Sequence, residues 1–185
     1  MSAIVTPATP AEAKGLLRTA IRGTDPVIFL ENAALYGMKG DVPDGDFALP
    51  FGRADVARAG RDATIVTYGR MLHFALAAAG QLHEEGIETE VINLRTLRPL
   101  DTESMIASVS KTHRAVVVQE QWKPFGAAGE IAATIYEHVF DELDAPVERV
   151  TGADVPMPYA RNLELLATPH EGDIVKAVKK TLYKA

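Results

Sequence analysis

Short apolar runs alternate along the chain with segments in which apolar residues recur every three or four positions. The runs have the length and the β-branched content of buried strands: "ATIVTYG", "TEVINL", "RAVVVQE" and "VERV". The other segments have the spacing of amphipathic helices: "RMLHFALAAAGQLHEEG", "TESMIASVSKT", "GEIAATIYEHVFDEL" and "DIVKAVKKTLYK". This alternation predicts an α/β fold, with an open, mostly parallel sheet and helices on both of its faces.

Signals at the ends of these segments refine the prediction. The segment "RADVARAG" predicts a further strand, and the connector "GRD" predicts that it forms a hairpin with "ATIVTYG". This hairpin would give the sheet one antiparallel strand. "RTLRPLD" predicts a turn that leads to Asp101, whose carboxylate can cap the next helix. Gly86 follows the first long helix and is a candidate for its C-cap.

Another helix is predicted near the start of the chain. In "TPAE", Thr9 can cap the helix, Pro10 suits the first helical position, and Glu12 can complete a capping box. Gly23 ends this helix. Four apolar side chains share one of its faces: Leu16, Leu17, Ala20 and Ile21. The next segment, "PVIFLEN", has four apolar residues in a row and predicts a buried strand.

The composition changes after Leu35. The segment "YGMKGDVPDGDFALP" is rich in Gly, Asp and Pro and has little periodicity, so it predicts a linker. The one helix and one strand before it cannot form a sheet by themselves and look like the remnant of a preceding domain. We therefore predict a remnant at residues 1–37, a linker at 38–50 and an α/β domain at 51–185.

Composition narrows the class of protein. The chain has 185 residues, no cysteine and a net charge of −6. The lack of cysteine excludes disulfides, thiol chemistry and Cys-ligated zinc, and the acidic balance disfavours nucleic acid as a partner. No apolar run is long enough to span a bilayer, and the start "MSAIVTPATP" does not have the pattern of a secretory signal. We expect a cytoplasmic protein that binds neither nucleic acid nor a membrane.

Polar residues follow the predicted parallel strands, where ligand crevices lie in open α/β sheets. They are Tyr68-Gly69-Arg70, Asn93-Leu94-Arg95, Glu120-Gln121-Trp122 and Gly152-Ala153-Asp154. The turn "TYGRM" could bind an anion at a helix N-terminus. A glycine is also needed there simply to turn the chain, and we favour this second interpretation. The sequence contains no nucleotide-binding fingerprint and no nucleophile elbow.

Glu120 is a candidate for a general acid or base, because it follows the apolar run "AVVVQ" and partial burial could raise its pKa. Such a role needs a partner, and His113 lies at the far end of the strand, roughly 20 Å away. We favour a hydrogen bond between Glu120 and the loop that follows it. The histidines lack the spacing of metal ligands: His73, His83, His113, His138 and His170.

Two further segments carry candidate interaction residues. In "VTGADVPMPYARNLELLATP", Pro156 and Pro158 hold φ fixed ahead of a short predicted helix. They present Tyr159 with little ordering cost. Trp122 and Phe125 lie in the predicted loop "QWKPFGAAG". Each segment could equally pack within the fold or anchor a partner.

Four segments resemble a known family: "AKGLLRTAIRGTDPVIFLENAALYG", "EVINLRTLRPLD", "VVVQEQWKPFG" and "DAPVERVTGADVPMPYA". They are similar to the C-terminal part of the β subunit of the pyruvate dehydrogenase E1 component. The resemblance runs from about Ala8 to Lys184, and "INLRTLRP" and "RVTGADVPMPYA" are its most specific parts. The β subunits of branched-chain 2-oxoacid and acetoin dehydrogenases are also similar, although "VTGADVPMPYA" favours the pyruvate enzyme.

The resemblance implies an α2β2 enzyme that uses thiamine diphosphate and magnesium, decarboxylates pyruvate and reductively acetylates the lipoyl group of the E2 component. Its β subunit has an N-terminal pyrimidine-binding domain, which residues 1–37 would continue, and a C-terminal domain of the transketolase type. The catalytic carboxylate and histidine of the β subunit belong to the N-terminal domain, in a stretch that this sequence does not contain. We therefore expect no catalytic or cofactor-binding residue here, and no activity from this chain alone.

One metal site carries over in part. Some family members bind potassium through backbone oxygens at the helix end that matches "AIRGTD". By position, this implies Ala20, Ile21, Gly23 and Asp25. Carbonyl oxygens at a helix C-terminus suit a hard cation. This chain departs from the family by having Gly-Thr where an acidic or amide residue is common.

The resemblance also implies three protein partners: the E1 α subunit, a second β subunit and the subunit-binding domain of E2. The E2 domain is basic, which complements an acidic chain. The candidate contact residues are Asp154, Pro156, Met157, Pro158, Tyr159, Trp122 and Phe125. The competing hypothesis is an independent small α/β enzyme that uses the "YGR" and "QEQW" loops. In a β-subunit fragment, "GLLRTAI" and "VIFL" should expose apolar surface and either form an oligomer contact or be partly disordered.

Overall fold

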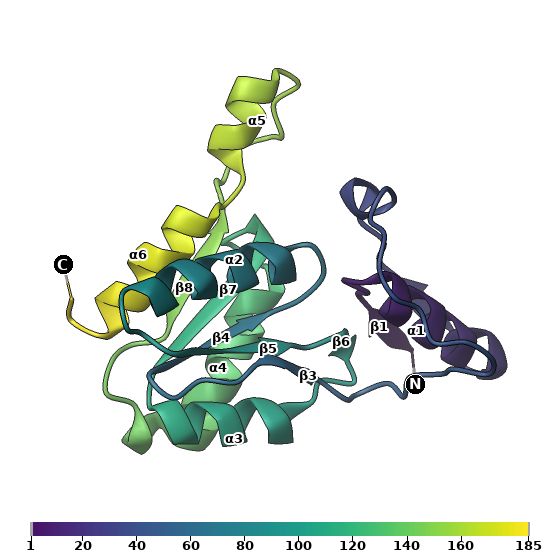
Figure 1. The fold of residues 1–185 in the computed structure, drawn as a ribbon, viewed down its shortest axis with the longest axis horizontal. Helices are drawn as coiled ribbons and strands as arrows, with labels where there is room; N and C mark the ends of the chain where they lie inside the picture. Colours follow the sequence, from purple (N-terminus) through teal and green to yellow (C-terminus); the bar gives the residue numbers. More distant parts are fainter. Residues whose placement is uncertain (1, 185) are drawn as a thin grey trace.

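The computed structural model describes residues 2–184, which form two parts (Figure 1). Residues 51–184 form a larger α/β unit, here called the body. Residues 2–50 form the N-terminal lobe, which lies beside one edge of the body (Figure 1). None of the helices in the described range is both long and apolar enough to cross a membrane.

A five-stranded sheet forms the middle of the body, in the order β3-β5-β4-β7-β8. The strands are β3 (Asp55–Arg58), β4 (Ala63–Thr67), β5 (Thr89–Asn93), β7 (Ala115–Trp122) and β8 (Glu148–Gly152). Neighbouring strands from β5 to β8 pair in parallel, and β3 pairs antiparallel with β5. The predicted open, mostly parallel sheet with one antiparallel strand is confirmed.

The predicted hairpin is wrong, because β3 pairs with β5 and not with β4. The connector crosses the start of β5, where the backbone N–H groups of Arg61 and Asp62 both donate to the Glu88 carbonyl. Gly60 permits this crossing, since a Cβ atom there would lie 2.1 Å from the carbonyl carbon of Thr89. Both edges of β4 are taken by parallel neighbours, so only the outer edge of β5 is left for β3.

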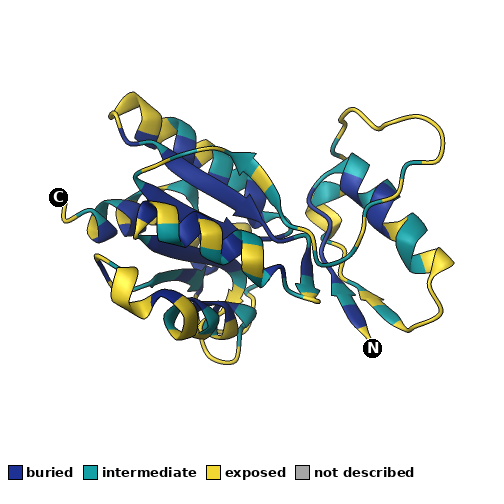
Figure 2. Cartoon of the chain, turned by 90° about the horizontal axis from the view of Figure 1, so that it is seen from below, coloured by how far each residue is buried: buried dark blue, intermediate teal, exposed yellow. Residues whose placement is uncertain are grey.

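A pair of helices covers each face of the sheet: α2 (Met71–Glu84) and α6 (Glu171–Thr181) on one, α3 (Thr102–Thr112) and α4 (Ala127–Val139) on the other. A short 3-10 helix, η2 (Phe140–Glu142), follows α4. The strands and the inner helix faces are buried, and the outer faces are exposed (Figure 2). Two predicted helix ends are confirmed: Gly86 has a φ of 77°, and the Asp101 side chain accepts a hydrogen bond from the N–H of Ser104.

One carboxylate lies buried on β5. Glu90 accepts hydrogen bonds from Ser108 Oγ at 2.6 Å, from the N–H of Gly60 at 3.3 Å and from the Lys111 ammonium. Burial alone would raise the pKa of this carboxyl, but the donors outweigh burial and hold the pKa of Glu90 below its ordinary value of 4.5. The folded state therefore stabilises the charged form of Glu90.

The N-terminal lobe contains β1 (Ala3–Val5), α1 (Pro10–Arg22), β2 (Val27–Phe29) and the 3-10 helix η1 (Ala33–Leu35). β1 pairs parallel with β2 and antiparallel with β6 (Thr96–Arg98), which comes from the body. The turn predicted for "RTLRPLD" is thus wrong over the three residues of β6, and β1 is not predicted at all. Strands of three residues are too short to show periodicity, and their partners lie far away in the sequence.

The start of α1 differs from the prediction in one contact. Thr9 caps the helix by accepting a hydrogen bond from the N–H of Glu12 at 3.2 Å, and a proline occupies the first helical position, both as predicted. The Glu12 carboxylate does not close a capping box with Thr9. It accepts a hydrogen bond from the N–H of Ala8 at 2.8 Å instead, which leaves its second oxygen for the body.

Glu12 joins the lobe to the body. Its Oε1 accepts hydrogen bonds from Arg95 Nε at 2.7 Å and from Asn93 Nδ2 at 2.8 Å. Arg95 also pairs with Asp55 at 3.3 Å. The backbone of Arg95 has a φ of 59°, which turns the chain after β5 back toward the lobe. Because Glu12 is buried, this contact defines how the lobe is oriented on the body.

The apolar stripe predicted on α1 is only partly covered. Leu16 is fully buried, whereas Leu17 and Ile21 are exposed. β2 is an edge strand, and the side chain of its central residue, Ile28, is 53% exposed, so the prediction of a buried strand is wrong here. The lobe therefore carries the exposed apolar surface that was expected for "GLLRTAI" and "VIFL".

The predicted linker, residues 38–50, folds back and packs against α1. The N–H of Leu49 donates to the Gly15 carbonyl at 3.1 Å, and Arg18 pairs with Asp46 at 3.0 Å. Gly15 makes room for this approach, because a Cβ atom there would lie 2.7 Å from Leu49 Cγ. The segment thus has packing contacts of its own, and the division of the chain into domains at this point stays a prediction.

Candidate functional site: the carboxyl edge of the sheet

β4 and β7 lie side by side in the sheet, and the chain leaves them toward opposite faces. β4 leads into α2 and β7 leads into α4. In open α/β sheets, this divergence opens a crevice at the carboxyl ends of the two strands, where ligands bind. The predicted candidates that meet here are Tyr68, Gly69, Arg70, Glu120, Gln121 and Trp122.

Glu120 is the ionic centre of this edge. Its Oε1 accepts a hydrogen bond from Arg70 Nη1 at 2.9 Å, and its Oε2 accepts one from Asn32 Nδ2 at 2.8 Å. The predicted bond to the following loop is wrong, since the partners come from the start of α2 and from the N-terminal lobe. His113 contacts the Glu142 carbonyl beyond the opposite end of β7, so the pair of Glu120 and His113 considered for acid–base work does not form.

The hydroxyl of Tyr68 lies next to this ion pair. It donates a hydrogen bond to Gln121 Oε1 at 2.8 Å. Burial, together with the negative charge of Glu120, raises the pKa of Tyr68 well above its ordinary value of 10. The phenol is therefore neutral at physiological pH and acts as a hydrogen-bond donor, not as a base.

Gly69 has a φ of 56°, in the left-handed region that favours glycine. This supports the interpretation that the glycine of "TYGRM" is needed to turn the chain. The guanidinium of Arg70 lies 5.1 Å from the centre of the Phe74 ring and forms an ion pair with Glu120. These two contacts orient the start of α2.

Gln119 is not among the predicted site residues, yet it shapes the loop after β7. Its buried side chain donates to the Trp122 carbonyl and accepts from the N–H of Ala128, both at 2.6 Å. A Cβ atom at Gly126 would lie 2.6 Å from the backbone oxygen of Trp122 and 1.9 Å from Gln119 Nε2, so only glycine fits there. An uncharged amide at the end of an apolar strand gives no sequence signal, apart from the nearby glycine.

Trp122 and Phe125 line a groove of about 950 Å³ at this edge of the sheet. The groove is lined by residues of the body, the lobe and the chain after β8, among them Leu30, Tyr68, Trp122, Phe125, Asp154 and Met157. Both aromatic side chains are exposed and do not cover the end of the sheet. Phe125 also has a φ of 55°, a backbone conformation that bulky residues rarely adopt.

Residues 153–168 form an arm that stands off the body and contains α5 (Arg161–Ala167) (Figure 1). The N–H of Ala153 donates to the Ala167 carbonyl at 2.9 Å and closes the base of the arm. Its exposed apolar side chains are Val155, Met157, Tyr159, Leu163, Leu165 and Leu166. The predicted Pro156–Pro158 segment and short helix are present, and they leave this apolar surface uncovered.

The residues implied for potassium lie at the end of α1. Ala20 and Ile21 belong to its last turn, where helix carbonyls lack intrahelical partners, and Gly23 ends the helix through its bond to the Thr19 carbonyl. Gly23 and Asp25 line one pocket of about 420 Å³. Among residues 2–184, no group of three His, Cys, Asp or Glu side chains could hold a metal ion. Potassium binding through backbone oxygens stays a prediction.

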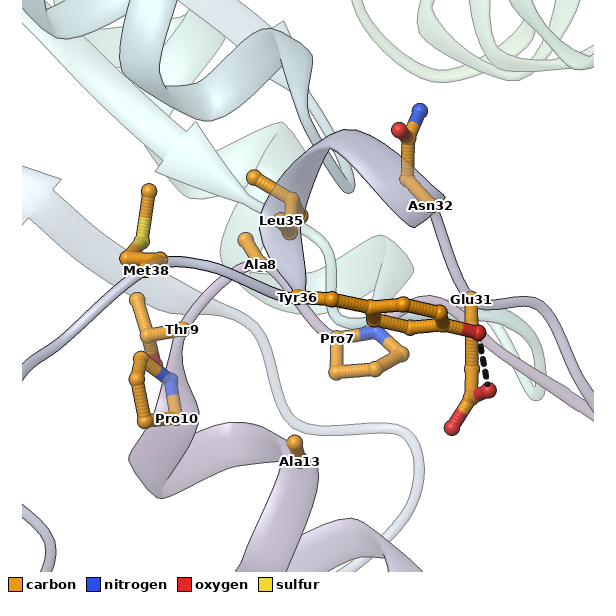
Figure 3. Close-up of a pocket in the computed structure, with 10 residues that line it drawn as sticks. All are labelled: Pro7, Ala8, Thr9, Pro10, Ala13, Glu31, Asn32, Leu35, Tyr36 and Met38. Atoms are coloured by element: carbon orange, nitrogen blue, oxygen red, sulfur yellow. Dashed lines mark hydrogen bonds between the residues drawn. The ribbon is translucent and has the colours of Figure 1, made fainter.

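A smaller pocket of about 240 Å³ lies in the lobe beside the start of α1 (Figure 3). Its walls are mostly apolar. The Tyr36 ring lies across its rim and its hydroxyl donates to Glu31 at 2.8 Å (Figure 3). The polar side chains in its lining, Thr9, Glu31 and Asn32, bond to Glu12, Tyr36 and Glu120, so they do not converge on a ligand as in a typical ligand site.

Residues 52–174 match the family described as the transketolase C-terminal domain, and the chain belongs to this family. It is 51% identical to the pyruvate dehydrogenase E1 component subunit beta-1, mitochondrial, of Arabidopsis thaliana, over 98% of this chain and 51% of the relative. It is 49% identical to the pyruvate dehydrogenase E1 component subunit beta of Rhizobium meliloti, over 98% of this chain and 40% of the relative. The resemblance seen in the sequence is confirmed, and the chain spans about half the length of the curated relatives it matches.

A solved structure described as a split gene transketolase, inactive beta4 tetramer, has the same fold. It superimposes with a TM-score of 0.77 at 27% sequence identity, over 98% of this chain and 57% of that chain. The similarity therefore includes the N-terminal lobe as well as the body.

Proposed function

We propose that this chain is the C-terminal part of the β subunit of a thiamine-diphosphate-dependent pyruvate dehydrogenase E1 enzyme. The observation that carries the proposal is the identity of about half of its residues to β subunits of that enzyme, across 98% of the chain. The relatives cited above are named for the pyruvate enzyme, which favours it over the branched-chain and acetoin enzymes.

In the proposed parent enzyme, pyruvate is decarboxylated and the lipoyl group of E2 is reductively acetylated, with thiamine diphosphate and magnesium bound between the α and β subunits. We assign no step of this chemistry to residues of this chain. The polar groups at the carboxyl edge support this view. Tyr68 is held as a neutral donor, and Arg70 and Asn32 occupy both oxygens of Glu120.

The role that remains for the chain is assembly with the E1 α subunit and a second β subunit, and docking of E2. Two exposed apolar regions support it: the outer face of the lobe, and the arm with the groove at its base. Phe125 combines full exposure with a left-handed backbone, and its ring has no aromatic or cation–π contact among those found for residues 2–184. A partner at this edge would bury the ring. The net charge of −6 complements a basic E2 subunit-binding domain, and the solved neighbour is described as a tetramer of β chains.

Two finer proposals accompany this role. One is that the chain works in the cytoplasm of a bacterial cell, although the plant relatives are named as mitochondrial. The other is that potassium binds the backbone oxygens at the end of α1. Potassium chloride should then raise the melting temperature above that in sodium chloride at equal ionic strength, because a bound ion stabilises the folded state. Equal melting temperatures would remove the potassium proposal.

A turnover assay tests whether the chain is an enzyme by itself. The purified chain is given thiamine diphosphate, magnesium, pyruvate and an artificial electron acceptor. We expect no decarboxylation. Measurable turnover would contradict the proposal and would favour an independent small enzyme.

Calorimetric titration with a purified E2 subunit-binding domain tests docking. We expect binding at low salt that weakens as salt is added, since rim charges are screened. Phe125→Ala should weaken binding, and Phe140→Ala is the matched control, because Phe140 is also exposed but lies on η2, outside the arm and the groove. Absence of binding at low salt would remove the docking role.

A further inference from the structure

Residues 30–36 cross from the lobe to the carboxyl edge of the sheet, and we call them the strap. Leu30, at the start of the strap, lines the groove together with Tyr68 and Trp122. Asn32 reaches Glu120 at the end of β7. The strap therefore lies over the point where the loops after β4 and β7 diverge.

Most contacts of the strap stay within the lobe. The N–H of Leu30 donates to the Val5 carbonyl at 2.8 Å, the N–H of Leu35 donates to the Asn32 carbonyl at 2.9 Å, and Tyr36 bonds to Glu31. None of the three residues of η1 is buried. Among the hydrogen bonds and ion pairs found for residues 2–184, the one that joins the strap to the body is Asn32 to Glu120.

The hydrogen bond between Asn32 and Glu120 has a charged acceptor and is only partly exposed to water. Arg70 holds Oε1 of Glu120 at 2.9 Å, which leaves Oε2 directed at Asn32 Nδ2 at 2.8 Å. A bond to a charged acceptor is stronger than one between neutral groups, and the Glu120 side chain is only about a quarter exposed. Asn32 is among the residues that line the lobe's pocket, and Figure 3 shows its side chain directed away from the other labelled side chains.

We propose that the strap is a movable cover of the groove, closed by the hydrogen bond between Asn32 and Glu120 and open when that bond is lost. In the closed state Leu30 lines the groove and both oxygens of Glu120 are occupied. Opening frees Oε2 of Glu120 and uncovers the Tyr68 side of the groove. The proposal rests on contacts within this chain and is independent of the function proposed above.

The rest of the lobe does not have to move when the strap opens. β1 stays paired with β6, and Glu12 stays bonded to Arg95 and Asn93. Segments with few buried side chains open locally at a small fraction of the free energy of global unfolding. A single-turn 3-10 helix without buried residues adds little resistance to such opening.

Asn32→Asp tests the proposal. The variant keeps the shape of the side chain but places a second carboxylate against Glu120, and like charges at this distance repel. At neutral pH the amides of residues 30–36 should exchange hydrogen about tenfold faster or more, as expected for the loss of a hydrogen bond to a charged group. Trp122, the only tryptophan of the chain, should become easier to quench with acrylamide.

Two further variants sharpen the test. Asn32→Ala removes the donor without adding charge, but it also removes the Oδ1 atom that accepts from the N–H of Ala34 at 3.0 Å. Its readout is therefore the quenching of Trp122, which should rise less than in Asn32→Asp. Glu31→Gln is the matched control, because Glu31 is the neighbouring residue and bonds to Tyr36 instead of the body. Its exchange and quenching should equal those of the unchanged chain.

Two results would overturn the proposal. One is that Asn32→Asp leaves both the exchange of residues 30–36 and the quenching of Trp122 unchanged. The other is that exchange rises equally in β1 and β6, since the strap would then open only together with the lobe.

Discussion

The body and the N-terminal lobe are built from the same kinds of element, but only the body covers its apolar surface with its own residues. The body places its sheet between two pairs of helices, and Ile65 in the middle of β4 is fully buried. The lobe has one helix against a three-stranded sheet, and Ile28 on its edge strand is half exposed. The lobe therefore depends on the body for part of its packing and leaves an apolar face exposed.

The two regions also differ in the forces that hold them. The body is held by non-directional apolar burial in two cores. The lobe is attached by the pairing of β1 with β6, by Ala8, which packs in one core of the body, and by a few directional side-chain and backbone contacts. These contacts are Glu12 to Arg95, Thr6 N–H to the Arg95 carbonyl, the Ala8 carbonyl to His73, and Asn32 to Glu120. Few polar contacts thus decide the orientation of the lobe, and single substitutions can change it.

The largest expected effect is a loss of stability that distinguishes the buried core of the body from the exposed edge strand of the lobe. Ile65→Ala should lower the free energy of unfolding by about 2–5 kcal/mol, because it leaves a cavity in a close-packed core. Ile28→Ala makes the same change on the exposed edge strand and should cost less than about 1 kcal/mol. Urea unfolding of both variants measures the difference. Equal losses would show that the edge strand is covered in solution.

The next largest effect is a loss of stability when the contact of Glu12 with Arg95 and Asn93, which joins the lobe to the body, is removed. Glu12→Ala leaves Arg95 and Asn93 without their buried acceptor and should cost about 3 kcal/mol. The loss should be concentrated in the lobe, where hydrogen exchange of α1 and β1 rises above that of the body. Asp46→Asn is the control, since this exposed carboxylate pairs with arginines on the same helix and should change stability much less. Uniformly faster exchange in body and lobe would contradict a joint at Glu12.

A smaller effect should appear as a pH dependence of the body. The pKa of Glu90 is lowered in the folded state, so its contribution to stability is complete above its ordinary value of 4.5 and is lost as the pH falls through the lowered folded-state value. Glu90→Gln should cost about 2 kcal/mol at neutral pH and should flatten the fall in melting temperature in acid. Glu103→Gln, on the exposed start of α3, should leave the curve unchanged. Parallel acid curves for all three proteins would argue against a charged Glu90.

The smallest effect on stability is expected on the arm. Leu166 is 80% exposed, so Leu166→Ser should change the free energy of unfolding by less than about 0.5 kcal/mol. The same change should weaken association with the proposed partners, measured by light scattering and by titration with the E2 domain. Loss of stability without loss of association would show that α5 packs on the body in solution.

The order and type of the elements after residue 54, apart from β6, could be predicted because they depend on local signals. The helix caps at Thr9 and Asp101 and the turn at Gly86 each involve residues only a few positions apart. The hairpin prediction failed because the choice between β4 and β5 as the neighbour of β3 depends on which edges the parallel strands leave open.

The candidate site could be predicted only in outline. The rule for open sheets places Tyr68, Arg70 and Glu120 at one edge, and the structure brings them together. The partner of Glu120 from the lobe, Asn32, lies 88 positions away in the sequence, and no local pattern connects the two. Glu12 was assigned to a local capping box, although its closest charged partner, Arg95, is 83 positions away.

The sequence by itself determined the succession of the longer strands and helices, the α/β class and the family, because periodicity, caps and residue identity are properties of neighbouring positions. Only the tertiary structure decided which strands pair, which apolar faces stay uncovered and which donors each carboxylate finds. These depend on contacts between segments that are distant in the chain, and a hydrogen bond or a buried face exists only once both segments are in place.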